Sequence, residues 1–254
     1  MKYYAIISIL LISLLISSCK KEETYTSNYD YGYSYFPDDS GCYVIYKVDS
    51  VLYNDFDRSM KYTTIYLKEK IGAQFLDNMG RTAKKILRYY SDTISTDITS
   101  TVWDQYNANY IVKTPIVVER VEDNLRYIKM VFPNEINKKW LGNKYITIPP
   151  PFVLDSTNYY LNDWKFTIKN RDKFFSDGIS TFDSSLLISQ IQDSSAITKT
   201  YSVERYARNV GLIYKEMWMV STQDSVKIRL QLPWEQRADK GFIIRQYAIA
   251  YGKE

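Results

Sequence analysis

The sequence predicts an all-β protein whose sequential antiparallel strands form a curved sheet or a barrel-like meander, with few short helical turns. Three observations carry this prediction. Runs rich in Val, Ile, Tyr and Thr recur along the chain and are separated by short polar turns. Several of these runs alternate apolar and polar residues, which is the period of a half-buried strand. No long segment shows the 3.6-residue apolar period of an amphipathic helix.

Residues 1–18 are predicted to be a signal peptide. Lys2 precedes an apolar segment that runs from Tyr3 to Ile16, and polar residues follow it directly. A helix that spans a bilayer needs about 20 predominantly apolar residues, so this segment is too short to remain as a span. We therefore expect it to be removed.

The residues around Cys19 resemble the lipobox of bacterial lipoproteins, because Ile16, Ser17 and Ser18 precede the cysteine. The resemblance implies that the Cys19 thiol carries diacylglycerol, that the chain is cut before it, and that the new amine receives a further acyl chain such as palmitate. Two or three acyl chains make a stable anchor, since each buried CH₂ contributes about 0.8 kcal/mol. The alternative is an ordinary secretory peptide with an incidental cysteine. We predict Cys19 as the lipidation site and the membrane as its partner.

Charge and sorting signals bear on where the protein acts. The formal net charge is only +4, and basic and acidic residues are interspersed, so we expect no nucleic-acid partner. Lys20-Lys21-Glu22-Glu23 also resembles the short charged signals that send some Bacteroidota lipoproteins to the cell surface. The expected location is the outer membrane, on either its periplasmic face or the cell surface.

Residues 19–40 are predicted to be a lipidated, Tyr-rich tether, and residues 41–254 a β-rich domain. Tyr29, Tyr31, Tyr33 and Tyr35 alternate along the tether, so they share one side of an extended chain. They form either a row of rings for stacking on a sugar or a partner, or a spacer whose tyrosines lie on the neighbouring domain.

The first half of the β-rich domain contains five strand-like runs: 43–53, 62–72, 83–90, 110–121 and 125–132. Polar turns are predicted at 54–59, at 77–81 and at 122–124, where Asn, Asp and Gly tolerate the backbone of tight connections. Pro115 lacks a backbone donor, so its strand is expected at an edge or at a bulge.

The second half repeats this pattern after Pro149-Pro150-Pro151. A subdomain boundary near 149–162 and a long crossover within one domain both fit this breaker. Strand-like runs follow at 164–170, 185–191, 200–206, 211–221, 226–232 and 242–251. The run 226–232 shows the cleanest alternation in the chain. Short helical turns are considered at 134–140 and 203–209.

Several short strings resemble small lipoproteins of Bacteroidota of unknown function. They are residues 43–53, LKEKIGAQFLDNMGR with ILRYY, the WLGN stretch, ERYARNVGLIYKE with its GLIYKE motif, and the closing FIIRQYAIAYGKE. The resemblance implies a lipidated, β-rich envelope protein and carries no active-site residues. The chain departs from it at Cys42 and Val44, where bulkier aromatic residues are expected.

The absence of histidine excludes several chemistries. Ser-His-Asp and Cys-His arrangements and His-based zinc sites require it, and Cys42 alone cannot form a thiolate cluster. No glycine-rich phosphate loop occurs. Residues 54–57 and Asp177-Gly178 faintly suggest calcium, but neither has the EF-hand spacing, and polar turns explain both. We predict no cofactor and no metal.

Paired carboxylates could still hydrolyse glycosidic bonds without histidine. The candidates are Glu119 with Glu122, and Glu204 with Glu216, each of which is more often a solvated charge or a salt-bridge partner. Burial and facing direction decide between these alternatives.

Aromatic residues are abundant, with 25 Tyr, 10 Phe and 5 Trp. Trp103, Trp140 and Trp234 lie in turn-like, polar surroundings and are the candidates for aromatic contact with a ligand. Plugging the end of a sheet is the alternative role for these rings.

These observations predict a lipid-anchored cell-envelope protein that acts as a non-catalytic binding or assembly module, whose partner is an envelope protein or a glycan. One alternative is a histidine-free, carboxylate-based glycan-processing enzyme. Another is a carrier of an apolar ligand, which requires a dry cavity inside the curved sheet.

Overall fold

The computed structural model describes residues 29–146 and 164–254. Cys19, the signal peptide and the predicted boundary near 149–162 lie outside the described residues. The chain divides into two compact units, Met1–Asp30 and Tyr31–Glu254, and all described strands and helices belong to the second.

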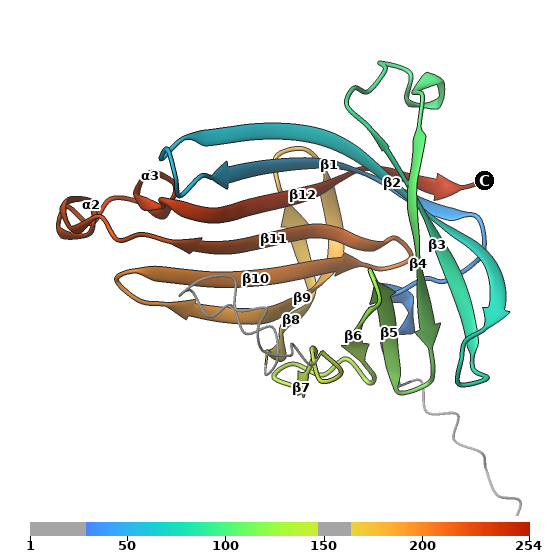
Figure 1. Cartoon of the computed structure of the whole chain (residues 1–254). Coiled ribbons are helices and arrows are strands. Elements are labelled where there is room, and N and C mark those ends of the chain that lie inside the picture. The colour runs from blue at the N-terminus through green and yellow to red at the C-terminus, as the bar shows by residue number, and fades with distance from the viewer. Residues whose placement is uncertain (1–28, 147–163) are drawn as a thin grey trace, which may run out of the picture. The chain divides into compact units, whose positions relative to one another are not determined.

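The described part of Tyr31–Glu254 contains one antiparallel sheet of twelve strands, which confirms the all-β prediction (Figure 1). The first six strands are β1 (Cys42–Tyr53), β2 (Met60–Leu76), β3 (Thr82–Ser91), β4 (Asp104–Lys113), β5 (Val117–Glu122) and β6 (Leu125–Val131). The other six are β7 (Lys139–Leu141), β8 (Lys165–Ser176), β9 (Thr181–Ser194), β10 (Thr198–Ala207), β11 (Gly211–Ser221) and β12 (Lys240–Lys253). The helices described are short: η1 (Tyr33–Tyr35), η2 (Ile98–Ser100), α2 (Ser225–Arg229) and α3 (Trp234–Arg237).

The strand order is β6-β5-β4-β3-β2-β1-β12-β11-β10-β9-β8-β7. Each half of the chain is therefore a meander in which consecutive strands pair, and the two meanders join where β1 pairs with β12. This junction is long, since Cys42 lies opposite Lys253 at one end and Tyr53 opposite Gly241 at the other. The edges of the sheet are consequently β6 and β7, which come from the middle of the chain.

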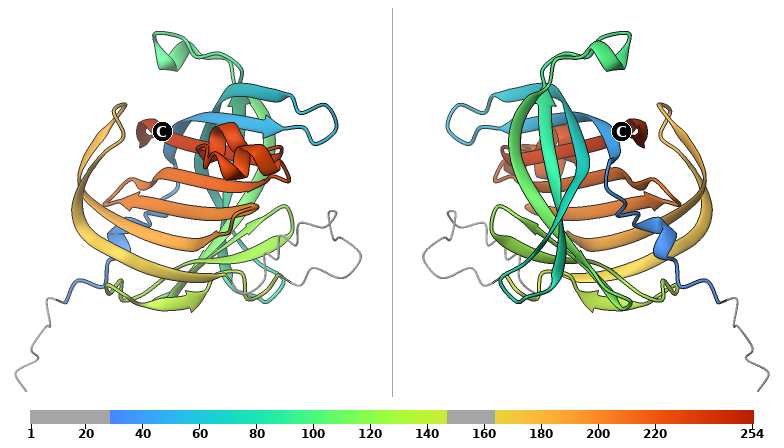
Figure 2. Two further views of the ribbon diagram at one scale, coloured as in Figure 1. Left: turned by 90° about the vertical axis from the view of Figure 1, so that its left-hand side faces the viewer. Right: turned by 90° about the vertical axis from the view of Figure 1, so that its right-hand side faces the viewer.

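The sheet curls until these two edges meet (Figure 2). The backbone N–H of Ile128 on β6 donates to the carbonyl of Gly142, just after β7, at 2.7 Å. The indole Nε1 of Trp140 on β7 donates to the carbonyl of Ile128 at 2.8 Å. A Cβ at position 142 would lie 2.3 Å from the Phe166 ring, so glycine permits this close approach. The barrel-like curvature predicted from the strand pattern is confirmed.

The main apolar core fills part of the interior and includes η1. Tyr35 is fully buried and Phe36 nearly so, and both pack with residues from strands on either side of the barrel. The Tyr35 hydroxyl donates to Oδ1 of Asp172 on β8 at 2.7 Å. Arg208 donates to the same oxygen through its Nε at 2.9 Å. The last residues of the predicted tether region thus contribute side chains to the core.

The prediction of a strand at 226–232 is wrong. Ser225–Arg229 forms α2, and the Asp224 side chain caps it by accepting the backbone N–H groups of Val226 and Lys227. Because β11 and β12 already pair with each other, the segment between them has no strand to join. Of its alternating apolar side chains, Val226 is 51% and Leu230 is 61% exposed, whereas Ile228 and Leu232 are half-buried. The cap on α2 therefore decides the local structure, because an alternating segment forms a strand only where another strand can pair with it.

Three smaller expectations are also corrected. Val203–Ala207 belongs to β10, so no helical turn forms at 203–209, and 134–140 is a turn that leads into β7. Pro115 lies in the turn between β4 and β5 instead of in a strand, and the Thr114 N–H donates to the Val117 carbonyl across that turn at 2.9 Å. Pairing with adjacent strands decides the first two cases, since β10 pairs with β9 and β11 and β7 pairs with β8. The fixed φ of Pro115 suits a turn.

The predicted turns at 77–81 and 122–124 join β2 to β3 and β5 to β6. Asp123 and Asn124 have φ values of 48° and 65°, as a two-residue hairpin turn requires. Among the described residues, no helix combines the length and the apolar composition that crossing a bilayer demands.

Candidate functional site: a charged cavity inside the sheet

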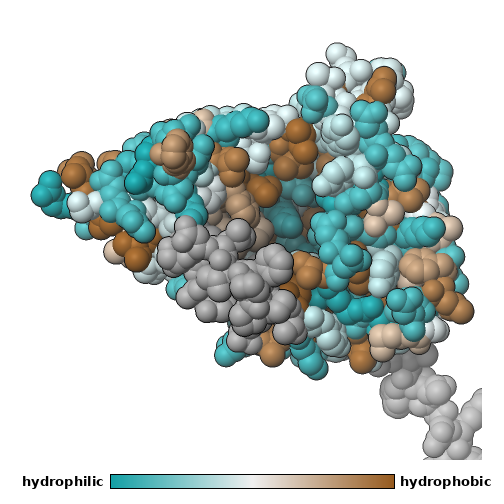
Figure 3. Space-filling model, in the orientation of Figure 1, coloured by the Kyte–Doolittle hydropathy of each residue, from teal (hydrophilic) through white to brown (hydrophobic). Residues whose placement is uncertain are grey.

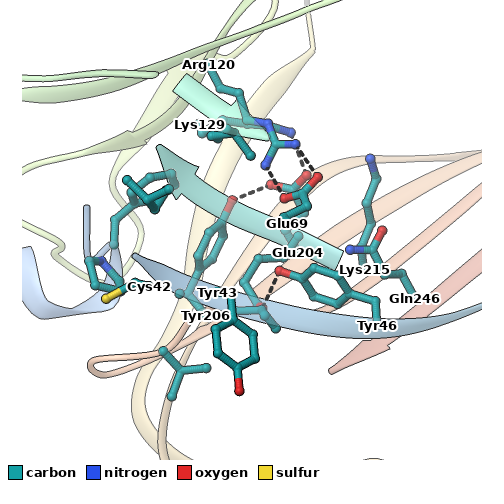
Figure 4. A pocket seen from close by; sticks show the side chains of 18 of the residues that line it. Cys42, Tyr43, Tyr46, Glu69, Arg120, Lys129, Glu204, Tyr206, Lys215 and Gln246 are labelled. Atoms are coloured by element: carbon teal, nitrogen blue, oxygen red, sulfur yellow. Dashed lines mark hydrogen bonds and ion pairs between the residues drawn. The ribbon is translucent and has the colours of Figure 1, made fainter. Parts of the chain in front are cut away.

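The curved sheet encloses a cavity of about 90 Å³ beside the apolar core. Figure 3 shows a hollow on this face of the molecule with hydrophilic residues in its depth, and Figure 4 shows the cavity from close by. Its lining is rich in charge. The cations are Arg88, Arg120, Lys129 and Lys215, and the carboxylates are Glu69, Glu122 and Glu204.

Strand alternation explains how these side chains converge. Residues two apart on a strand share one face of the sheet, so Arg120 and Glu122 on β5 face inward together. Residues opposite each other on paired strands also share a face. Glu204 on β10 lies opposite Lys215 on β11, and Lys215 lies opposite Gln246 on β12. The interior-facing rows of distant strands therefore meet in one cavity.

Lys129 and its neighbour Met130 both face the interior because of a β-bulge on β6. Val118 pairs with Met130 and Glu119 pairs with Ile128, so Lys129 is an extra residue in the register. Lys129 lines the cavity while its neighbour Met130 lies in the apolar core, although strict alternation would place them on opposite faces. A bulge redirects a side chain in this way.

One ionic group is centred on Arg120. Its guanidinium donates two hydrogen bonds to Glu69, at 2.9 Å and 2.6 Å, and its Nε lies 2.7 Å from Oε1 of Glu122. Arg88 also contacts Glu69, at 3.1 Å. Burial acts to raise the pKa of the Glu69 and Glu122 carboxyl groups, but the surrounding cations more than offset it and hold both pKa values below their usual range.

A second ionic group is centred on Glu204, which is 1% exposed. Lys129 Nζ donates to its Oε1 at 2.6 Å, and the Tyr206 hydroxyl donates to its Oε2 at 2.6 Å. Burial opposes the charge, yet Lys129 and Lys215 lower the pKa of Glu204. Burial and the nearby Glu204 carboxylate raise the pKa of Tyr206 well above its ordinary value. Both oxygens of Glu204 are thus engaged by groups other than its cross-strand neighbour Lys215.

Lys215 consequently has no carboxylate partner among the described residues. Within the part of the chain that the structure describes, its ammonium makes no hydrogen bond and no ion pair, and no dashed line reaches it in Figure 4. Burial lowers the pKa of Lys215, and the positive charge of Lys129 lowers it further. Gln246 is a buried residue, with an exposed fraction of 8%. Its amide also has no side-chain hydrogen bond among the described residues, and Figure 4 shows it directed the same way as Lys215.

The ionisation of the three cavity carboxyl groups limits the acid–base chemistry that they can perform. Each of the three cavity carboxyl groups has a lowered pKa, so each is ionised at neutral pH. A general acid in glycoside hydrolysis requires a carboxyl group with a raised pKa. The cavity instead presents a fixed set of charges with one uncompensated ammonium and one uncompensated amide.

The two carboxylate pairs considered from the sequence do not converge. Glu122 lines the cavity, whereas Glu119 binds Arg81 and Arg126 on the other face of β5. Glu204 lies inside, whereas Glu216 accepts hydrogen bonds from Trp218 and Tyr214 on the outer face of β11. Strand alternation separates each pair. Inside the cavity, Glu122 comes close to Glu204, since both contact Lys129, and to Glu69, since both contact Arg120.

The three candidate tryptophans lie on different elements. Trp103 is half-buried just before β4. Trp140 closes the seam between β6 and β7 and packs edge-on against Phe166, with ring centres 5.7 Å apart. Trp234 lies in α3, packs on a small apolar cluster with Trp218, and has the Arg237 guanidinium 3.9 Å from its ring centre. β7 and α3 lie well apart in Figures 1 and 2, so Trp140 and Trp234 do not share a surface.

Two other sequence features have simple structural settings. Residues 54–57 belong to the turn between β1 and β2, and Asp177 caps the turn between β8 and β9 by accepting the N–H groups of Ile179 and Ser180. Within the described residues, no group of three or more acidic or cysteine side chains is placed to hold a metal ion. Cys42 is a free, half-buried thiol that lines the cavity at the start of β1.

Sequence reasoning missed Arg88, Arg120, Lys129, Lys215 and Gln246 as members of one site. Because side chains alternate along a strand, Lys215 faces the opposite side of the sheet from Tyr214 and Glu216, and this could be inferred from the sequence. The register of β10, β11 and β12 was not readable, and neither was the bulge at Lys129, so the sequence did not indicate which charges meet.

Comparisons with known proteins add little to this description. No family model and no curated protein matches the chain. Two solved structures, each covering 86% of this chain and 98% of their own, are similar to it. One is from Bacteroides fragilis and is provisionally described as an exported protein with a YmcC-like fold, at 10% identity and a TM-score of 0.33. The other is from Parabacteroides distasonis and is provisionally described as a lipoprotein, at 13% identity and a TM-score of 0.31. Scores of this size support no inference about the fold or function of this chain.

Proposed function

We propose that this protein is a lipid-anchored, non-catalytic binding module of the cell envelope that holds a small polar ligand in the cavity inside its sheet. The observation that carries the proposal is the cavity itself. It is lined by an ordered set of ion pairs, and it retains an ammonium and an amide without partners among the described residues. Neither polar group is sealed from solvent, since Lys215 is only partly buried, so both remain accessible to a ligand that enters the cavity.

The anchoring part of the proposal rests on the sequence. The apolar leader, the lipobox-like residues before Cys19 and the resemblance to Bacteroidota lipoproteins support attachment to the outer membrane through acyl chains. The sequence is compatible with both locations, the periplasmic face of the outer membrane and the cell surface.

The two alternatives have less support. A carboxylate-based glycan-processing enzyme needs a protonated acid, and the cavity carboxyl groups have lowered pKa values. A carrier of an apolar molecule needs an apolar cavity, and this lining holds seven charged side chains.

Native mass spectrometry of the full-length protein, extracted in detergent from its membranes, tests the binding function. We expect a low-mass adduct that is released when the protein is unfolded. Absence of any adduct, combined with no thermal stabilisation by a panel of small polar molecules, would reject the proposal.

The anchor and the enzyme alternative need separate measurements. Cys19→Ser should abolish acylation and the cut before residue 19, and any chain released by a cut elsewhere should appear in the soluble fraction. The double amide variant Glu122→Gln/Glu204→Gln addresses catalysis: glycan turnover by the wild type that disappears in this variant would favour the enzyme.

A further inference from the structure

We propose that the ligand of this cavity is anionic, and that Lys215 and Gln246 bind its carboxylate or phosphate group. This inference rests on the proposed function and specifies its ligand class. It follows from how the charges inside the sheet are partnered.

The first step is the charge balance of the lining. Four cationic side chains face three carboxylates, so one positive charge is uncompensated. In a cavity walled by protein, an unpaired charge attracts an opposite charge that enters more strongly than it would in bulk water. An anion would complete the balance, whereas a cation would increase the imbalance.

The second step identifies which cation is available. Arg120 is engaged by Glu69 and Glu122, Arg88 by Glu69, and Lys129 by Glu204. Each of these three has a carboxylate within 3.1 Å. Lys215 has no such contact with any residue that the structure describes, so its ammonium is the one offered to a ligand.

The third step is that the neighbouring carboxylates are held away from Lys215. Glu204 is fixed by Lys129 on one oxygen and by Tyr206 on the other. Glu122 is fixed by the Nε of Arg120 at 2.7 Å and lies 3.8 Å from Lys129. Turning either carboxylate toward Lys215 would break an ion pair that is already made, so an internal rearrangement gains little.

The fourth step is the pairing of Lys215 with Gln246. They lie directly opposite each other on β11 and β12, and a buried amide N–H₂ beside an ammonium presents several donors to one point. Carboxylate and phosphate oxygens accept such charge-assisted hydrogen bonds well. The neutral amide of Gln246 can also bind an uncharged polar group. The preference for an anion therefore comes from the positive charge of Lys215.

Size limits what enters. On the same measure one water needs about 10–15 Å³, so the cavity of about 90 Å³ holds several waters. That space fits a carboxylate or a phosphate group. The remainder of a larger ligand would extend into the hollow seen in Figure 3.

Isothermal titration of the folded protein with sodium phosphate, and separately with sodium acetate at constant ionic strength, tests the proposal. We expect one of the two anions to bind, and the arm that responds identifies a phosphate-type or a carboxylate-type ligand. Lys215→Met, which keeps the length and removes the charge, should weaken that binding by about tenfold or more. Lys215→Arg should retain most of it, and Gln246→Leu should weaken it to a smaller extent.

Lys61→Met is the matched control. Lys61 lies on β2, is exposed, and loses the same charge when replaced. We expect its anion affinity to equal that of the wild type. Circular dichroism and thermal melting of each variant confirm that loss of binding does not reflect unfolding.

The outcomes separate this inference from the proposed function. If anion binding weakens equally in Lys215→Met and Lys61→Met, the loss reflects net charge alone, and the proposed site at Lys215 is overturned. Failure of both anions to bind the wild type would also overturn the anionic ligand. In that case an adduct in native mass spectrometry that is neutral or cationic would leave the binding function standing, whereas absence of any adduct would remove both.

Discussion

Lys129 on β6 and Glu204 on β10 form a buried ion pair across the interior, with Nζ and Oε1 2.6 Å apart although 75 residues separate them in the chain. The nearest cation to Glu204 by strand pairing is Lys215, which lies opposite it on β11. Lys129 engages one oxygen of Glu204 and Tyr206 engages the other, which leaves Lys215 available. An ion pair between strands that are far apart in the sheet order thus determines the binding character proposed for the cavity.

Removing one member of this pair should destabilise the protein strongly. Glu204→Gln leaves Lys129 buried without its counter-charge, so we expect the free energy of unfolding to fall by about 3–5 kcal/mol. Urea denaturation followed by fluorescence measures it. Lys47→Met, which removes a partly exposed ion pair with Asp49, is the control and should cost less than about 1 kcal/mol. Similar losses in the two variants would show that the Lys129–Glu204 pair has no special role.

Replacing Lys215 should have the opposite effect on the unliganded protein. Lys215→Met removes an ammonium whose pKa is lowered by burial and by Lys129, so the folded state no longer holds an unpaired charge. We expect the free energy of unfolding to rise by on the order of 1 kcal/mol. Thermal melting without added anions checks this. A lower melting temperature than that of the wild type would contradict the unpaired state of Lys215.

Stability should depend on pH in the acid range. Burial acts to raise the pKa of Asp172, but hydrogen bonds from Tyr35, Ser184 and Arg208 lower it to about 2. Glu69 and Glu204 also have lowered pKa values in the folded protein. Carboxyl groups with depressed pKa values stabilise the fold fully above their unfolded pKa, and this stability is lost as pH falls through the folded value.

Melting temperatures recorded from pH 7 to pH 2 should therefore stay level down to about pH 4.5 and then fall. Asp172→Asn should flatten the lower part of this decline, because it removes the group that titrates near 2. A decline that begins near pH 6 would point to groups other than these carboxylates.

The η1 segment should contribute to stability out of proportion to its three residues. Tyr35→Ala empties a fully buried site and should cost about 3–5 kcal/mol. Tyr35→Phe keeps the ring and loses the hydrogen bond to Asp172, for which we expect about 1.5–3 kcal/mol. Tyr62→Ala, at a side chain that is 68% exposed, should change stability by less than about 0.5 kcal/mol. Equal effects at Tyr35 and Tyr62 would place η1 outside the cooperative core.

Local patterns in the sequence determined the fold class and many turns. Period-two alternation in runs such as 43–53 and 242–251 indicated strands with one inward face, and Asp123-Asn124 indicated a hairpin, because these features depend on residues adjacent in the chain. The same reasoning failed at 226–232, where alternation was present but α2 formed, since β11 and β12 left that segment no strand to pair with.

The lipobox-like residues at Cys19 and the absence of histidine likewise came from the sequence alone. Only the tertiary structure decided that β1 pairs with β12, that β6 meets β7, and that Tyr35 enters the core. It also decided that Glu204 pairs with Lys129 while Lys215 and Gln246 stay available. The physical reason is that alternation assigns a side chain to a face of the sheet, whereas long-range register and bulges choose its partner across the interior.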